Sequence, residues 1–298
     1  MYDWLLDSDP SIRWQVMRDL LEEPADVVAR ERARIATEGW GARLLDLQGD
    51  GEHWSGVTPG WASTQNALTL LGDMGIDPED ERVRQAIARV RDHYTWGPHF
   101  GNSPFFEGET EPCINGRGVL AAGAYFGEVS ERVLQRLLSE QLPDGGWNCE
   151  APPSVVSSFH TTINVLEGLL EYELAKGATP AVSEARRRGE EYLLERRLFR
   201  SRTTGDVVDP QFTELAFPNW WHYDVLRALD YFRRANVRDA RLAEAIELVR
   251  GKADAEGRWA RERIYGDAHF EMEGGVGQPS RWITLRALRV LRWYDAGR

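Results

Sequence analysis

The feature that most constrains the fold is a repeat of about fifty residues along the chain. Six apolar, helix-like segments recur at roughly this spacing, and a charged segment lies between each successive pair. Long alternating strand patterns are nearly absent. Helical pairs that repeat at this period form either open solenoids or closed rings. The apolar segments begin near Asp9, Trp61, Cys113, His160, Trp221 and Trp282.

The two kinds of segment differ in which faces they can bury. Trp61 to Leu71 (WASTQNALTLL) is small and apolar all round, whereas Glu81 to Tyr94 (ERVRQAIARVRDHY) is charged on one face. A helix that is apolar all round is buried on most sides. An inner ring of such helices, wrapped by charged outer helices, buries them better than an open stack. The sequence therefore predicts an all-α protein: a single α/α toroid domain over residues 1–298, with about six inner and five to six outer helices.

Several helix ends are also predicted. Asp9 is a plausible N-cap, because Pro10 follows it at the first helical position. One charged helix is expected from Ala25 to Gln48. Another is expected to begin after the cap at 77–80.

Composition excludes several classes of function. A net charge of −12 and a pI near 5.1 argue against binding to nucleic acid or to an anionic membrane, since both need a basic surface. No apolar run approaches the roughly 18–20 residues that span a bilayer. The first ten residues carry three aspartates and no basic segment, so no secretory signal is predicted. Two cysteines do not form a disulfide framework, and a cytoplasmic protein is expected.

Glycine-tryptophan turns recur between the segments. The clearest is Gln141 to Trp147 (QLPDGGW), and weaker copies lie at Gln48 to Trp54 and Glu256 to Trp259. Glycine supplies positive φ after a helix, Asp144 can accept hydrogen bonds in the turn, and the tryptophan can pack over the next hairpin. These turns resemble the QW-type motifs of the squalene cyclase and prenyltransferase repeat superfamily, whose members fold as α/α toroids. The resemblance in periodicity covers nearly the whole chain, and the central turn matches most closely.

A second, local resemblance concerns a metal. Glu111-Pro-Cys113 and His160-Thr…Leu166-x-Gly-Leu are similar to the zinc-site elements of protein prenyltransferase β-subunits, with Glu in place of Asp and Pro in place of Gly. This resemblance implies that Glu111, Cys113 and His160 are zinc ligands. Cys149 lies in the loop before His160 and can be a fourth ligand or replace Glu111. A Cys₂His set would resemble the zinc site of lanthipeptide cyclases, which are also α/α toroids.

The residues themselves support this zinc site. If Cys113 and His160 begin neighbouring parallel inner helices, their side chains converge at one rim. Thiolate, imidazole and carboxylate ligands suit zinc, and an open fourth position would make the site catalytic. The alternative is two buried cysteines and a helix-capping histidine, because free cysteine is among the most buried residue types. The sequence contains no CxxC or HExxH motif to decide between them.

The fifth apolar segment offers candidate catalytic residues. His222 can act as an acid–base group or ligand, and Asp224 can orient it. Trp221 and Tyr223 are then candidates for binding substrate. The alternative is a helix cap with aromatic packing.

Two arginines lie near inner-helix starts. Arg117 and Arg281 could hold a diphosphate, as basic residues do in prenyltransferases, or could pair with carboxylates at the rim. Trp282, next to Arg281, is a further candidate for binding substrate.

The resemblance implies an enzyme of the prenyltransferase or terpene cyclase type, a transferase or cyclase, acting on an isoprenoid (diphosphate) or thiol substrate in a central cavity. Zinc would activate a thiol by lowering its pKa. The Asp-x-Asp-Asp motif of squalene-type protonation is absent. A metal-free terpene cyclase with an aromatic cavity and a non-catalytic toroid that binds a lipid or a partner protein remain alternatives. Protein prenyltransferases need an α-subunit, so the resemblance also allows a protein partner.

Overall fold

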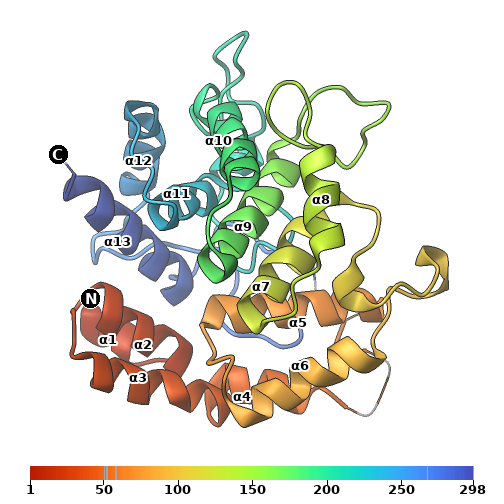
Figure 1. Cartoon of the computed structure of the whole chain (residues 1–298). Helices are drawn as coiled ribbons and strands as arrows, with labels where there is room; N and C mark the ends of the chain where they lie inside the picture. The colour runs from red at the N-terminus through yellow and green to blue at the C-terminus, as the bar shows by residue number, and fades with distance from the viewer. Residues whose placement is uncertain (50, 52, 58, 267, 298) are drawn as a thin grey trace. The chain divides into compact units, whose positions relative to one another are not determined.

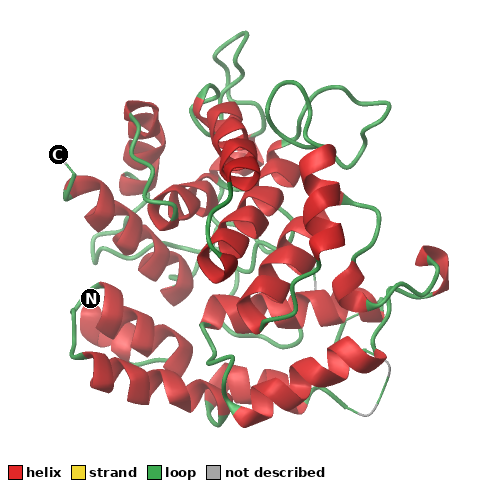
Figure 2. Ribbon diagram, viewed as in Figure 1, coloured by secondary structure: helices red, strands yellow, loops and turns green. Residues whose placement is uncertain are grey.

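The computed structural model describes residues 1–49, 51, 53–57, 59–266 and 268–297. Regular secondary structure in these ranges is helical, apart from four isolated β-bridges (Figure 2). The all-α prediction is therefore confirmed. The contacts within the chain define two compact units, which are described separately; the single domain over 1–298 stays a prediction. Unit 1 comprises Met1–Arg34, Leu193–Gly266 and Glu271–Arg298, and unit 2 comprises Ile35–Tyr192 and Asp267–Phe270.

Each predicted apolar segment is a helix, and a charged helix lies between each successive pair (Figure 1). The apolar helices are α2 (Pro10–Asp19), α5 (Gly60–Met74), the π-helix η4 (Ile114–Ala121) continued by α7 (Ala122–Phe126), α9 (Phe159–Lys176), α11 (Val225–Arg234) and α13 (Arg281–Asp295). The charged helices are α3 (Ala25–Ala33), α4 (Gly39–Asp46), α6 (Glu81–His93), α8 (Glu131–Ser139), α10 (Pro180–Leu194) and α12 (Ala243–Arg250). Shorter helical turns are α1 (Tyr2–Leu6), η1 (Arg34–Ala36), η2 (Pro98–Phe100), η3 (Phe105–Glu107), η5 (Pro210–Thr213) and η6 (Ala240–Leu242).

Two predicted helix starts are confirmed and one predicted helix is wrong. Asp9 caps α2 by accepting a hydrogen bond from the Ser11 backbone N–H at 2.9 Å, and Asp80 caps α6. The helix predicted from Ala25 to Gln48 is instead divided into α3, η1 and α4. The chain turns at the start of α4, where Gly39 has a φ of 68°, a left-handed conformation that suits glycine.

In unit 2 the apolar helices pack against one another through glycines. Helix η4 contacts both α5 and α9 (Figure 1). A Cβ at Gly116 would lie 2.6 Å from the carbonyl oxygen of Asn164 on α9. On the α5 side, a Cβ at Gly118 would lie 2.6 Å from Gln65. The two glycines therefore let η4 approach a helix on each side.

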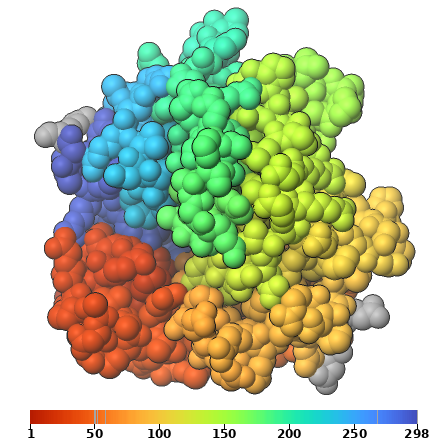
Figure 3. Space-filling view, viewed as in Figure 1, coloured from red at the N-terminus to blue at the C-terminus, as the bar shows by residue number. Residues whose placement is uncertain are grey.

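The charged helices α8 and α10 of unit 2 form part of the surface seen in the space-filling view (Figure 3). Helix α8 turns Val133, Leu134 and Leu137 inward, so only one of its faces is buried. This one-sided burial is what the charged segments predicted.

In unit 1, α13 packs against α2, α11 and α12. A buried charge cluster joins three of these helices. Arg289 on α13 lies 3.3 Å from both Asp230 on α11 and Asp19 on α2, and it donates to Gln15 at 2.6 Å. These ion pairs satisfy charges that the packing of α13 removes from water.

The glycine-tryptophan turns form a repeated hydrogen-bonded unit. The indole N–H of each tryptophan donates to a carbonyl ten residues earlier: Trp54 to Leu44, Trp147 to Leu137 and Trp259 to Val249, at 2.7–2.8 Å. Each tryptophan backbone N–H donates to a threonine in the first turns of the next apolar helix: Thr64, Thr162 and Thr284. Each turn therefore ties the end of a charged helix to the start of an apolar one.

The glutamines of two turns add a third link. Gln48 and Gln141 donate to the carbonyls of Ala86 and Ala185, which lie on the next charged helices, at 2.8 Å. The scaffold role that the sequence predicted for these turns agrees with these contacts.

Candidate metal centre

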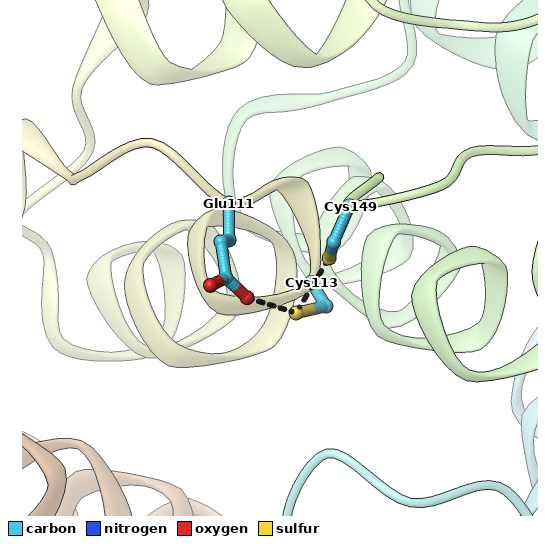
Figure 4. Close-up of side chains that lie close together, drawn as sticks. All are labelled: Glu111, Cys113 and Cys149. Carbon is cyan, nitrogen blue, oxygen red and sulfur yellow. Dashed lines mark hydrogen bonds between the residues drawn. The ribbon is translucent and has the colours of Figure 1, made fainter. Parts of the chain in front are cut away.

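Three of the predicted zinc ligands lie together in unit 2. Glu111, Cys113 and Cys149 each offer a ligand atom, and these atoms all lie within 4.8 Å of one another (Figure 4). Cys113 Sγ lies 2.9 Å from Cys149 Sγ and 3.5 Å from a carboxylate oxygen of Glu111. Two sulfurs and a carboxylate at these distances are a donor set that fits zinc.

The first two residues come from the start of one helix. Glu111 is exposed and Cys113 is buried at the N-cap of η4. The π-helical turns that follow are rare in proteins and frequent at functional sites. The sequence predicts a helix here but gives no signal for its π-helical form.

The loop before η4 is held by a buried carboxylate. Glu109 accepts hydrogen bonds from the backbone N–H groups of Thr110 and Glu111. The guanidinium of Arg136, on α8, donates to the carbonyls of Glu109 and Thr110 at 2.6 and 2.7 Å. Burial raises the pKa of Glu109. These contacts fix the backbone from which the Glu111 side chain projects.

The third residue, Cys149, comes from the loop that leads into α9. Its backbone N–H donates to Thr161 Oγ1 at 3.3 Å, and its sulfur lies 3.4 Å from the same oxygen. Ser158 caps α9 through the Thr161 backbone N–H. The start of α9 therefore orients Cys149 through Thr161, one residue after the predicted ligand His160.

A hydrogen bond joins the two thiols, with their sulfurs 2.9 Å apart. This bond, followed by burial, raises the pKa of Cys113. The same bond lowers the pKa of Cys149, and Thr161 adds to that effect.

The fourth predicted ligand, His160, is not part of this cluster. It is half-buried in the first turn of α9, and its carbonyl accepts a hydrogen bond from Asn164 at 2.7 Å. Its role as a ligand stays a prediction.

The predicted catalytic pair lies in unit 1. The buried carboxylate of Asp224 caps α11 by accepting from the Arg227 N–H at 2.8 Å, and it also accepts from Ala216 and Asn219. Burial raises its pKa, and these hydrogen bonds oppose the rise. Such a cap is the alternative that the sequence left open.

His222 stacks between two aromatic rings. Its centroid lies 3.7 Å from that of Trp221 and 3.6 Å from that of Tyr265. Trp221 is 48% exposed, so it forms the outer face of the stack. Catalytic roles for His222 and Asp224, and substrate binding by Trp221, stay predictions.

The other predicted substrate-binding residues make contacts within the protein. Arg117 forms ion pairs with Asp73 and Glu167, each at 2.8 Å. This is the pairing with carboxylates that the sequence offered as the alternative to diphosphate binding.

Three residues of unit 1 are also engaged. Tyr223 is buried and donates to the Leu198 carbonyl. Trp282 is buried and stacks on Phe217. The guanidinium of Arg281 donates to the carbonyl of Trp4 at 3.1 Å. Their predicted part in substrate binding is untested.

Three residues near the metal centre were not predicted to be part of it: Glu109, Arg136 and Thr161. They hold the ligands in position by hydrogen bonds and do not themselves belong to the ligand set. The sequence offered one indication for Thr161. It directly precedes Thr162, the threonine that accepts a hydrogen bond from the Trp147 backbone N–H. The sequence offered no indication for Glu109 and Arg136, since their contacts depend on how α8 packs.

Comparison with known proteins identifies the fold. No family model matches the chain, and no curated protein matches its sequence. A glycosyl hydrolase family 88 structure from Bacteroides vulgatus is 9% identical, with 99% of this chain and 95% of that one covered and a TM-score of 0.56. Type II terpene cyclase MstE from Scytonema, in its apo form, is 18% identical, with 97% and 88% covered and a TM-score of 0.48. A variant of that cyclase in complex with the substrate geranylgeranyl dihydroxybenzoate is 19% identical, with 97% and 86% covered and a TM-score of 0.45.

At these identities the likeness concerns the fold and not the activity. The match to the glycosyl hydrolase structure shows that the chain has the α/α toroid fold. The α/α toroid fold predicted from the alternation of apolar and charged segments is thus confirmed. None of the described helices is long and apolar enough to cross a membrane.

Proposed function

We propose that this protein is a zinc-dependent enzyme whose metal is held by Glu111, Cys113 and Cys149. The observation that carries the proposal is the convergence of these three side chains from the start of η4 and from the loop that leads into its neighbour α9. Zinc bound by three protein ligands keeps a fourth position for water or substrate. When bound, the metal would lower the pKa of a thiol or water in that position.

The surrounding residues would hold the ligands in place. Thr161 orients Cys149 from the first turn of α9. Glu109 and Arg136 fix the backbone before Glu111. A ligand set held by hydrogen bonds from rigid helices loses little freedom when the metal binds, which favours affinity.

Charge near the cluster favours a thiol over a diphosphate as the substrate. Glu109, Glu111 and Glu150 lie on the segments that supply the ligands, and carboxylates repel a diphosphate. Arg117, the predicted diphosphate-binding residue of this unit, is paired with Asp73 and Glu167. We therefore favour a thiol as the substrate.

Metal analysis of the purified chain tests the proposal. We expect one zinc per chain in the wild-type protein and loss of that zinc in Cys113→Ser and Cys149→Ser. Glu150→Gln is the matched control, because Glu150 is exposed, adjoins Cys149 and lies outside the cluster. Wild-type protein without zinc, or cysteine variants that keep it, would rule out the site.

A non-catalytic toroid that binds a lipid or a partner protein is the second candidate. It is favoured by the engagement of Tyr223 and Trp282 within the fold, since both were expected to contact substrate. The variant His160→Ala separates the two. Zinc lost with His160 indicates four protein ligands and a closed site, which is typical of structural zinc. Zinc kept without His160 supports the open site of an enzyme.

A further inference from the structure

The sulfurs of the two cysteines are separated by a distance intermediate between that of a disulfide bond and that of two thiolates on one zinc ion. Their sulfurs are 2.9 Å apart, and both are free thiols. A disulfide bond is about 2.05 Å long. Two sulfurs on one tetrahedral zinc, each about 2.3 Å from the metal, are about 3.8 Å apart. The observed separation is nearly midway, so a shift of about 0.9 Å in either direction reaches a bond or a metal site.

We propose that Cys113 and Cys149 form a reversible disulfide by exchange with a small-molecule disulfide, and that this removes both sulfur ligands from the metal centre. Disulfide formation does not require the proposed zinc function, because it needs only the adjacent pair and an external disulfide. Its regulatory effect rests on the proposed zinc function, because a disulfide sulfur no longer binds zinc as a thiolate.

The environment of the pair sets the order of the steps. Cys113 is only 7% exposed, whereas Cys149 is half-buried. An external disulfide therefore reaches Cys149 first. The Cys149 thiolate attacks one sulfur of that disulfide, forms a mixed disulfide and releases the first small thiol. Cys113, already in contact, then attacks the Cys149 sulfur and releases the second.

These steps balance. Two electrons and two protons leave the cysteine pair, and the small-molecule disulfide is reduced to two thiols. The reverse exchange with a reduced thiol restores the pair.

The backbone around Cys149 can supply the movement. Cys113 lies at the start of a buried helix. Cys149 lies in the loop before α9, in which Val155 and Val156 are 76% and 58% exposed. An exposed loop adjusts at lower cost than a packed helix start. The shift that closes the bond would therefore come from the Cys149 side.

Thiol counting tests the disulfide directly. The reduced, metal-free full-length protein is incubated with oxidised glutathione, denatured and analysed for free thiols and mass. We expect the two thiols to fall to none, with no glutathione attached. Two remaining thiols, or two attached glutathiones, would overturn the proposal.

Single variants test the order of the steps. Cys113→Ser should retain one glutathione on Cys149, because the second attack is removed. Cys149→Ser leaves only the buried Cys113, which should react roughly tenfold more slowly. Equal rates in the two variants would contradict the assigned order. Wild-type thiol loss remains decisive if either variant fails to fold.

Zinc release tests the regulatory effect and separates it from the proposed function. Zinc-loaded protein treated with oxidised glutathione should release one zinc per disulfide formed, measured with a chromophoric chelator. If the reduced protein binds no zinc but still forms the disulfide, the proposed function fails and the disulfide stands. If zinc is held and the disulfide never forms, the inference fails and the zinc site stands.

Discussion

At the scale of single residues, buried charge in unit 1 depends on pairing. Burial opposes ionisation of Asp230, but the guanidinium groups of Arg233, Arg289 and Arg286 hold its pKa well below its usual value. Burial lowers the pKa of Arg289 to about 10, and Asp230 and Asp19 oppose that shift. Removing one member of such a cluster leaves its partners buried with less compensation.

The variant Asp230→Asn should therefore lower the free energy of unfolding by about 3 kcal/mol near neutral pH. Because the pKa of Asp230 is lower in the folded state, its contribution is present above the unfolded pKa of about 3.9 and is lost as the pH falls below it. Urea denaturation at pH 7 and at pH 3 measures both effects. Asp26→Asn is the control, since the Asp26–Arg30 pair is about 70% exposed and should change stability by less than about 1 kcal/mol.

His269 should make the stability depend on pH in a different range. Burial lowers its pKa to about 4, and its Nε2 lies 3.0 Å from Ser63 Oγ. Between about pH 6.5 and pH 4 the unfolded chain binds a proton that the folded protein does not, so stability falls as the pH falls. The loss should reach up to about 3 kcal/mol. Stability of His269→Gln, measured from pH 7 to pH 4, should lose this dependence; an unchanged profile would contradict it.

At the scale of elements, the close approach of η4 and α9 depends on glycine. A Cβ at Gly168 on α9 would lie 2.4 Å from the carbonyl oxygen of Gly116. The two helices thus meet backbone to backbone at these glycines. No side chain can be added there without moving one of them.

Gly116→Ala should destabilise the protein by about 1–3 kcal/mol, because the added methyl group would overlap the backbone at Asn164. Gly72→Ala on α5 is the matched control. A Cβ at Gly72 meets nothing within 4 Å, so alanine there should stabilise by about 0.5–1 kcal/mol through its higher helix propensity. Thermal unfolding of both variants measures the difference. Similar shifts in the same direction would show that the helix contact is not tight.

At the scale of the whole molecule, zinc should stabilise the fold. A metal that binds only the folded protein adds about 2.7 kcal/mol at a free concentration one hundred times its Kd, which raises Tm by about 5 °C for a chain of this size. Cys113→Ser and Cys149→Ser should remove the shift. Mg²⁺ serves as a control, because it prefers oxygen ligands and leaves thiols unbound. An equal shift with Mg²⁺ would show non-specific binding.

Much of the helical framework could be predicted from the sequence. Asp9 and Asp80 mark helix starts because their side chains cap the next turn, an effect that acts within a few residues. The break before α4 was missed because Gly39 lies within an otherwise helical pattern. The π-helical form of η4 was missed because it depends on how the helix packs against its neighbours.

The candidate site could be predicted only in part. The recurring helix starts placed Cys113 and His160 at the ends of neighbouring helices. The sequence thereby identified the part of the chain in which the metal cluster lies. The sequence could not decide which side chains converge, because that depends on rotation about each helix axis and on the path of the loop before α9. The contacts of Thr161 bring Cys149 to Cys113, and His160 lies outside the cluster.

The sequence by itself determined the alternation of apolar and charged helices and the tryptophan turns between them, because both rest on periodicity and local hydrogen bonding. Only the tertiary structure decided that Glu111, Cys113 and Cys149 form one cluster and that Arg117 is paired with carboxylates. Those outcomes depend on distances of a few ångströms between segments 36 or more residues apart. Such distances are fixed by side-chain packing between helices, which local pattern does not encode.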